Sequence, residues 1–571
     1  MNEEIAEIFN EIADLLDVKG VDFKPRAYRK AARKIGSMKD DVKEYYEDDS
    51  LKDIEGVGDA MEDKIEEIIE TGSLEYLEEL KEELPSGLID VMNVPDIGPK
   101  SAKKLYEELG VEDLDSLKEE AEAGNIEELK GFGKKTQKKI LQGIEMLEEI
   151  SGRHLLNEVI PIAEDLIDHL GPKAEKIEKA GSMRRWKETI GDVDILATGE
   201  RDELMETFVD HEEVEEVLVK GETKTSVRLK GGIQADLRVV EAGSFGAALQ
   251  YFTGSKEHNV SVRQIAIDKG YKLNEYGLFR KDDEEKVAGG SEEGIYEELD
   301  LKWISPELRE DRGEIEAAKE GSLPELVERD EIKGDLQSHS DWSDGHNTVF
   351  EVAEEAQNKG YEYIALTDHS QGLSVAGGLT SEDIKEREEE IDEVNEELDI
   401  NVLSGIEVDI KKDGTLDMDS ETLKELDIVL GAVHSNFKMD EEKQTERIKK
   451  AFETGLIDIF AHPTGRKIGE REGYEVNVSE MIQSAEENEV VLEINASPKR
   501  LDLDSLNARE AKEEGVTISL GTDAHGLNHL DYMKYGVATA RRAWLETDDV
   551  LNTRSYEDLM DFIHDRGDRD G

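Results

Sequence analysis

Cysteine is absent from the 571-residue chain, which excludes disulfide bonds and thiolate metal sites. Any bound metal must therefore be held by histidine and carboxylate side chains. Long apolar runs are also absent, and none reaches membrane-spanning length. The N-terminus has the pattern of an acidic amphipathic helix and not of a signal peptide, so we expect a cytoplasmic protein with no membrane partner.

Basic residues are scarce, because 71 lysines and arginines stand against 141 aspartates and glutamates, a formal net charge of −70. Proteins that bind nucleic acid ordinarily carry a basic surface. The acidic residues are spread through every segment, which is typical of adaptation to a concentrated-salt cytoplasm where charge repulsion is screened. We therefore expect a halophile, and among halophiles an archaeon. The alternative is a protein that avoids nucleic acid.

The stretch 181–194 combines a phosphate-binding turn with a metal site. Asp192 and Asp194 begin an apolar run that predicts a strand, whose period of two puts both carboxylates on one face. Asp236, in the apolar run 233–240, supplies a third carboxylate. Three such carboxylates beside a phosphate turn are the equipment of two-metal nucleotidyl transfer. For Asp-x-Asp alone, a solvated strand face is the alternative.

Upstream, Gly181 follows residues 173–180, where we expect a helix. The glycine permits a tight turn with exposed N–H groups, and Ser182 adds a hydroxyl. Arg184 and Arg185 offer guanidinium forks for phosphate oxygens.

This Gly-Ser…Arg-Arg…Glu…Gly-Asp-x-Asp pattern resembles the family X DNA polymerases. The segment Tyr251-Phe-Thr-Gly-Ser255, with residues 274–276, resembles the nucleotide pocket of that family. The resemblance implies that Asp192, Asp194 and Asp236 are catalytic and bind Mg²⁺ or Mn²⁺, and that Arg263 reaches the template. Without it, Tyr251 and Phe252 would be ordinary core aromatics. The nucleotide-binding residues implied are Gly181, Ser182, Arg185, Gly191, Tyr251, Phe252, Gly254 and Asn259.

The first 85 residues predict helices, interrupted by a glycine turn. Such a turn at a helix N-terminus is the helix-hairpin-helix signature, in which backbone N–H groups face a DNA phosphate. Two further copies follow, the first with Asp96 in place of its leading glycine, and they predict a duplex-gripping module at 86–148. The turn glycines expected to bind DNA are Gly56, Gly58, Gly98, Gly131 and Gly133.

The family resemblance extends to this region, where it implies a lyase domain over residues 1–85. Lys64 falls at the Schiff-base position of the family, and Lys24, Tyr28 and Arg29 match positions that handle a 5′ phosphate. Ala60 stands where the family often has another lysine, which weakens the phosphate grip. The alternative for Lys64 is a backbone-phosphate contact or a surface charge.

The family resemblance also implies how the middle of the chain is divided. We expect a nucleotidyltransferase palm at 149–245 and a thumb of mixed helices and strands at 246–310. The charged stretch from Ser305 to Arg329 has glycine and proline toward both ends. It predicts a linker of moderate stiffness, placed at residues 311–332.

From residue 333 to 571, short apolar runs end in polar residues and alternate with helical segments. This alternation predicts a parallel α/β barrel with functional residues at the carboxyl ends of its strands. Eight of the twelve histidines lie here. A lone histidine at a strand end is usually structural, but a ring of His, Asp and Glu indicates a metal site, and without thiolates it suits Mn²⁺, Zn²⁺ or Fe²⁺.

This region resembles the PHP phosphoesterase domain, which implies a centre of up to three metal ions with Glu407 bridging two of them. Metal-bound hydroxide would attack a phosphodiester, and Arg466 and Arg500 would hold the phosphate. Gln337 stands where many such domains have a histidine, and an amide is a poorer ligand. The ligands implied are His339, Asp344, His369, Glu407, His434, His462, Asp523 and His525. His346, His529 and His564 match no ligand position.

Together these features predict a multidomain chain: all-α helix-hairpin-helix modules, an α+β palm and thumb, and a C-terminal α/β barrel. The function expected is gap-filling DNA repair synthesis from deoxynucleoside triphosphates on gapped or nicked DNA. The PHP domain would add 3′–5′ exonuclease or 3′-end and abasic-site processing, in a monomer. Three alternatives stay open: a PHP domain that is only structural or docks DNA, a DNA-end scaffold with an idle transferase site, and a transferase acting on ribonucleotides or tRNA.

Overall fold

The computed structural model describes residues 2–19, 21, 24–36, 38, 42–47, 50–54, 57–71, 74–82, 85, 87–92, 94, 97–150, 152–373 and 376–566. In these ranges no helix is both long and apolar enough to cross a membrane. The chain forms two compact units, Met1–Ser151 with Gly469–Arg471, and Gly152–Ile468 with Glu472–Gly571.

The first unit is helical and has two hydrophobic cores. Phe9, Ile12 and Ile65 belong to the core that joins α1, α2, α4 and α5. Leu105 and Ile140 belong to the second core, which joins α6 to α10. The all-α prediction is confirmed. The helices are α1 (Asn2–Lys19), α2 (Lys24–Gly36), α3 (Val42–Glu47), α4 (Asp59–Thr71), α5 (Glu75–Glu82), α6 (Leu88–Met92), α7 (Pro99–Leu109), α8 (Leu114–Glu122), α9 (Asn125–Glu128) and α10 (Lys134–Ile150).

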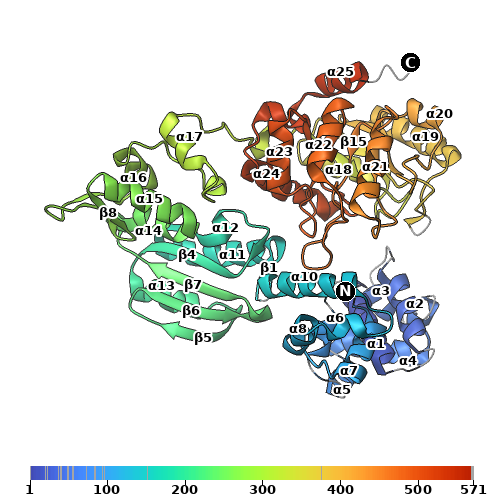
Figure 1. Cartoon of the computed structure of the whole chain (residues 1–571), viewed down its shortest axis with the longest axis horizontal. Coiled ribbons are helices and arrows are strands. Elements are labelled where there is room, and N and C mark those ends of the chain that lie inside the picture. The colour runs from blue at the N-terminus through green and yellow to red at the C-terminus, as the bar shows by residue number, and fades with distance from the viewer. Residues whose placement is uncertain are drawn as a thin grey trace. The chain divides into compact units, whose positions relative to one another are not determined.

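The second unit begins with a five-stranded sheet in the order β2-β4-β7-β6-β5, visible in green in Figure 1. Only β4 and β7 are parallel; the other neighbours are antiparallel. Val193 and Ile195 are buried against α11 and α13 on one face, and Leu196 packs against α14 on the other. The elements are β1 (His154–Leu155), α11 (Leu156–Leu170), β2 (Ala174–Lys179), α12 (Gly181–Arg184), β3 (Thr189–Ile190), β4 (Asp192–Gly199), α13 (Arg201–Val209), β5 (Val214–Lys220), β6 (Lys224–Leu229), β7 (Gln234–Val239) and α14 (Phe245–Thr253).

The stretch 173–180, where the sequence had led us to expect a helix, does not form an α-helix. It contains β2, which pairs antiparallel with β4 at the edge of the sheet. The segment is rich in Lys, Glu and Ala, which favour helix, but pairing with a central strand overrides this local preference. Its charged side chains suit an edge strand, because they discourage pairing with other chains.

A smaller α/β region follows, built on a three-stranded antiparallel sheet. Val262, Leu278 and Ile295 form its core, together with Ile315 and Ala318 of α17. Residues 311–332, where we expected a linker, therefore contain a helix that packs into this core. The elements are α15 (Lys256–Asp268), β8 (Tyr271–Asn274), β9 (Gly277–Arg280), β10 (Lys286–Ala288), α16 (Glu292–Glu298) and α17 (Glu314–Glu320).

The last part of the chain is a seven-stranded parallel sheet whose strands follow one another in sequence order. Its first and last strands meet, since Ser338 bridges Ala524 and the His339 amide donates to the Ala524 carbonyl over 2.8 Å. The predicted parallel α/β barrel is confirmed as a nearly closed one. The strands are β11 (Gly334–Ser338), β12 (Tyr363–Leu366), β13 (Asn401–Asp409), β14 (Ile428–Ala432), β15 (Ile459–Phe460), β16 (Val491–Asn495) and β17 (Ile518–Gly521).

Alternate residues along the barrel strands face two separate cores. Ile364 and Leu366 pack against the surrounding helices, whereas Tyr363 and Ala365 share the other core with Leu559 of α25. This packing leaves the carboxyl ends of the strands for polar side chains. The helices are α18 (Val349–Asn358), α19 (Ser381–Glu397), α20 (Ser420–Glu425), α21 (Glu441–Phe452), α22 (Val478–Glu487), α23 (Ser505–Glu513), α24 (Met533–Arg542) and α25 (Tyr556–Arg566).

Candidate functional site

Three aspartates meet on one face of the five-stranded sheet. Asp194 on β4 lies directly beside Asp236 on β7, and Asp192 precedes Asp194 by two residues on the same face. One carboxylate oxygen from each lies within 4.8 Å of the others. The sequence-predicted triad is therefore assembled by the parallel pairing of β4 and β7.

The electrostatics of this triad fit a divalent cation. Burial, followed by the neighbouring Asp192 and Asp236 carboxylates, raises the pKa of Asp194 to about 7. Burial and Asp236 likewise raise the pKa of Asp192. Such crowding of like charges is relieved when a cation binds between them, so the residues present suit Mg²⁺ or Mn²⁺.

The turn before the aspartates depends on glycine. Gly181 has φ +62, and a Cβ atom there would lie 2.4 Å from Asp194 Oδ2. The half-buried Ser182 follows it in α12, and Gly191 lies immediately before β4. The turn and the aspartates are thus in direct contact, as the motif had indicated.

The two arginines of the motif are both engaged by protein groups. Arg184 forms a bidentate pair with Glu292 at 2.8 and 2.9 Å. Arg185 donates to Glu310 at 3.1 Å and also to the Thr253 carbonyl. A triphosphate would have to share Arg185, the residue that the resemblance implied for nucleotide binding, with Glu310 and Thr253.

The residues expected to form the nucleotide pocket lie together as an aromatic corner. Tyr251 and Phe252 stack edge to face with ring centroids 5.1 Å apart, and Arg263 lies over the Tyr251 ring. Asn259 Nδ2 donates to the Tyr251 carbonyl over 2.7 Å, so it positions the corner. The φ of Gly254 is +71, and a Cβ atom there would lie 3.0 Å from Arg185.

Three cations near the aspartates had no motif to mark them. Lys224 on β6 forms an ion pair with Asp236. Arg153 donates to Thr189 Oγ1 over 2.9 Å and lies against Gly191. Arg238 lies 4.1 Å from the Phe252 ring centroid and lines an adjoining cavity of about 360 Å³. The sequence could have indicated only Arg238, because it follows Asp236 by two residues and therefore lies on the same face of the strand.

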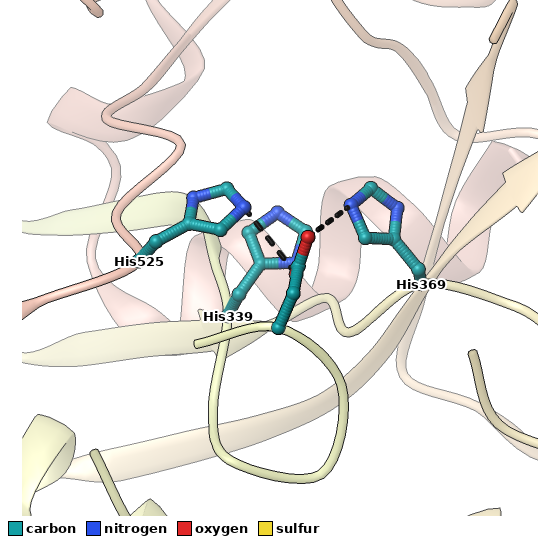
Figure 2. Close-up of side chains that lie close together, drawn as sticks. His339, His369 and His525 are labelled. Carbon is teal, nitrogen blue, oxygen red and sulfur yellow. Dashed lines mark ion pairs between the residues drawn. The ribbon is translucent and has the colours of Figure 1, made fainter. Parts of the chain in front are cut away.

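At the other site, histidines from successive barrel strands converge. Figure 2 shows the rings of His525, His339 and His369 grouped together. The ring centroid of His339 lies 4.3 Å from that of His525 and 4.6 Å from that of His369. Asp344 pairs with His525 Nε2 at 3.3 Å and with His369 Nε2 at 3.6 Å. These four residues could hold one metal ion.

Glu407 is the centre of a second group. This fully buried carboxylate lies 3.0 Å from His369 Nδ1, 3.3 Å from His434 Nε2 and 2.8 Å from His462 Nε2. Burial alone would lower the pKa of His369, but the Glu407 carboxylate raises it to about 9. Since His369 belongs to both groups, Glu407 and His369 lie where two ions would adjoin.

The remaining ligand candidate is Asp523, which lies 3.2 Å from His339 Nε2. Nδ1 of His339 and of His434 are buried with no hydrogen bond, and the buried His369 Nδ1 and Glu407 Oε2 face each other at 3.0 Å. Buried polar groups are rarely left so, and metal ions would satisfy them. The residues therefore fit a polynuclear metal centre.

Gln337 does not join these groups. It is fully buried, and with its amide nitrogen turned toward Glu493 it donates to that carboxylate over 3.1 Å. Gly521 lies against both side chains, and a Cβ atom there would be 2.1 Å from Glu493 Oε1. Glu493 is a partner that the sequence had not indicated.

The two arginines expected at the barrel phosphate site differ. Arg500 Nε lies 3.7 Å from Asp523 Oδ2, beside the metal ligands. Arg466 instead pairs with Glu188 of the preceding region at 2.7 Å and donates to the Arg500 carbonyl. The structure thus gives Arg466 a different partner from a substrate phosphate.

The histidines without a predicted ligand role stay outside both groups. His346 is exposed, and His529 stacks on Tyr532 with centroids 4.9 Å apart. His564 is exposed on α25.

In the first unit, the described turn glycines precede helix starts. Gly58, Gly98 and Gly133 come directly before α4, α7 and α10, and each accepts hydrogen bonds from the first turn of its helix. A Cβ atom at any of the three would meet open space, as would one at Gly131, whose φ is +97. Gly56, also expected at a turn, lies outside the described residues.

The residues of the expected lyase site are partly engaged. Lys64 is half-buried with Nζ 4.8 Å from the Tyr76 ring centroid. Arg29 pairs with Asp14 and Asp17 at 2.6 and 2.7 Å. Tyr28 is buried and Lys24 is exposed. A 5′ phosphate would have to compete with the two aspartates for Arg29.

Comparison with known proteins matches four parts of the chain to family models. They are a helix-hairpin-helix domain over residues 1–74, a SAM-like helix-hairpin-helix tandem over 88–146, a DNA polymerase beta thumb over 248–310 and a PHP domain over 335–497.

Among individual relatives, a "probable phosphatase" of Thermoanaerobacter sp. (strain X514) is 32% identical, covering 37% of this chain and 86% of its own. DNA polymerase lambda of Arabidopsis thaliana is 26% identical over a match that covers 54% of this chain and 62% of its own. The "DNA polymerase/3'-5' exonuclease PolX" of Bacillus subtilis (strain 168) is 40% identical, covering 98% of this chain and 99% of its own. Because this likeness extends along both chains, the chain belongs to the PolX family of DNA polymerases and 3′-5′ exonucleases.

Proposed function

We propose that the chain is a DNA repair enzyme that extends 3′ ends at short gaps with its five-stranded sheet and shortens 3′ ends with its barrel. The observation that carries the proposal is the pairing of Asp194 with Asp236 on adjacent parallel strands. It places three carboxylates beside the phosphate-binding turn, in a chain that is similar throughout its length to a polymerase with exonuclease activity.

In this proposal residues 149–245 act as the palm and 246–310 as the thumb. Bound at the aspartates, Mg²⁺ or Mn²⁺ would activate the primer hydroxyl and hold the leaving pyrophosphate. The turn at Gly181 and Ser182 offers N–H and hydroxyl donors to the triphosphate, and Arg153 adds a cation beside Gly191. Tyr251 and Phe252 pack against the sugar, with Asn259 fixing their position.

In the barrel, residues 333–571, two or three ions of Mn²⁺, Zn²⁺ or Fe²⁺ would supply hydroxide for phosphodiester cleavage. Asp344 and His525 hold one side of the centre, and Glu407 holds the other. Arg500 lies beside Asp523 and can bind the scissile phosphate once the metal ligands are satisfied.

The first unit would grip duplex DNA through its turns at Gly98 and Gly133. The open space at these glycines lets a phosphate approach the helix N-termini. Lys100, Lys134 and Lys138 are exposed on the helices that follow. Lys64 would serve as a lyase nucleophile in base excision repair, from its half-buried position with Nζ 4.8 Å from the Tyr76 ring centroid.

The setting proposed is the cytoplasm of a halophilic archaeon, with the enzyme acting as a monomer. The net charge of −70 supports this, because a surface of that charge is screened only in concentrated salt. Hydrated cations would then mediate contacts with DNA.

One observation favours a second possibility for the barrel. Gln337 is committed to Glu493 and not to the metal centre, which leaves one metal position short of a ligand. In that case the barrel would be a metal-stabilised module that docks DNA without hydrolysing it.

The test is a labelled primer on a one-nucleotide gapped duplex in molar KCl with Mn²⁺, with and without deoxynucleotides. Extension with nucleotides and shortening without them are expected. Extension alone would select the docking alternative for the barrel, and no extension would contradict the polymerase assignment.

A further inference from the structure

The loop between β2 and β4, residues 181–191, carries the phosphate-binding turn but has little regular structure of its own. It contains the single turn α12 and the two-residue strand β3. Between them Trp186 adopts φ +51, a conformation that costs a non-glycine residue energy unless its surroundings hold it. The groups that hold this loop therefore matter for phosphate binding.

One holding contact comes from α24 of the barrel. Arg542 donates to the backbone carbonyl of Arg185 over 2.6 Å and to Glu310 Oε1 over 3.1 Å. Arg185 donates to the same Glu310 oxygen over 3.1 Å. The Arg542 side chain is only 5% exposed, so this network is shielded from water and salt.

Two further contacts hold the other half of the loop. The Trp186 ring meets Tyr535 of α24 with centroids 6.4 Å apart, and Tyr535 is part of the core of the five-stranded sheet. Glu188 pairs with Arg466, whose guanidinium is also bound to the carbonyls of Arg500 and Leu501. Two stretches of the barrel, α24 and the segment that carries Arg466, thus contact one loop.

We propose that the barrel positions the triphosphate-binding loop of the palm, with Arg542 as its principal positioning residue. The inference rests on the proposed polymerase function and extends it. The aspartates are held by the β4–β7 ladder. The loop is held partly by neighbours outside the barrel, such as Glu292 and Thr253, and partly by the barrel contacts described above. Loosening the loop should therefore weaken nucleotide binding and leave the chemical step largely intact.

The experiment measures single-nucleotide gap filling by the full chain at varied deoxynucleotide concentration. R542M removes the contact to the Arg185 carbonyl and should raise KM about tenfold, with kcat changed by less than about twofold. R542K keeps a donor and should recover part of the loss. R541M is the matched control, because Arg541 is the adjacent residue of α24 but pairs with Glu307 and Glu328 and not with the loop.

The outcomes separate cleanly. If the wild-type chain does not extend the primer, the proposed function fails. If the wild-type chain does extend the primer, three results would overturn this inference alone. They are an unchanged KM in R542M, a fall in R542M that is confined to kcat, and a rise in the KM of R541M equal to that of R542M.

Should R542M not fold, the pair between Glu188 and Arg466 gives a second route. E188Q and R466M should each raise KM, and the double variant should raise it no more than the larger single effect. Fully additive effects, or none, would overturn the inference.

Discussion

The aspartate at the centre of the palm constrains even a glycine beside it. Gly181 has positive φ and no room for a Cβ atom against Asp194. G181A should strain the turn by about 1–3 kcal/mol and displace the Asp194 carboxylate, which should slow nucleotide incorporation about tenfold or more. G171A is the control, since Gly171 has helical φ and open space around it. Equal incorporation rates for the two variants would show that the turn tolerates a side chain.

Gln337 makes a different prediction at the same scale. Imidazole binds Mn²⁺ and Zn²⁺ better than a neutral amide does. Q337H should therefore retain about one more divalent ion per chain than the wild type, measured by elemental analysis after dialysis. Equal metal content would mean that the Gln337 position lies outside the centre.

Residue patterns predicted the carboxylates and barrel histidines well, because strand period and strand-end position bring them together. They did not indicate partners that come from distant segments. Arg185 is engaged by Glu310, and Arg466 by Glu188, and nothing local in the sequence marks either pairing. Lys224 and Arg153 were missed for the same reason.

Among the elements, α16 is tied to the palm through a buried carboxylate. Glu292 accepts from Arg184 and Arg309, and its side chain is 5% exposed. Burial would raise the pKa of Glu292, but Arg309 and Arg184 outweigh it and lower the value to about 2.

The depressed pKa of Glu292 predicts a pH-dependent stability. The stabilisation is fully present above the ordinary pKa of 4.5 and is lost as pH falls toward about 2; it amounts to about 3 kcal/mol. E292Q should lower the free energy of unfolding at pH 7, by urea denaturation, and the deficit should shrink below pH 4. E293Q, an exposed neighbour on α16, is the control. A deficit independent of pH would contradict the assignment.

Elements were predictable where the chain itself supplied the signal. The short apolar runs after residue 333 correspond to barrel strands, because runs that end in polar residues are typical of parallel sheets. The edge strand β2 was mistaken for a helix since its composition favours helix, and only pairing with β4 makes it a strand. Residues 311–332 were expected to form a linker, but Glu314 in this stretch is buried, with its Oε1 2.7 Å from His258 Nδ1.

For the whole molecule, charge is the dominant feature. At −70, repulsion opposes folding until salt screens it, as the Debye length falls from about 10 Å at 0.1 M to about 3 Å at 1 M. Raising KCl from about 0.1 M to about 2 M should increase the unfolding midpoint, because the added salt screens the repulsion that opposes the folded state. The midpoint is measured by circular dichroism, with a sucrose series as the control. An unchanged midpoint in KCl would argue against salt adaptation.

The central claim is that one chain holds two independent active sites, and one assay on gapped duplex tests it directly. D236N should reduce primer extension by about a thousandfold while primer shortening without nucleotides continues at the wild-type rate. E407Q should abolish shortening and leave extension intact. Loss of both activities in either variant would contradict the claim, because it would mean that the two sites do not act separately.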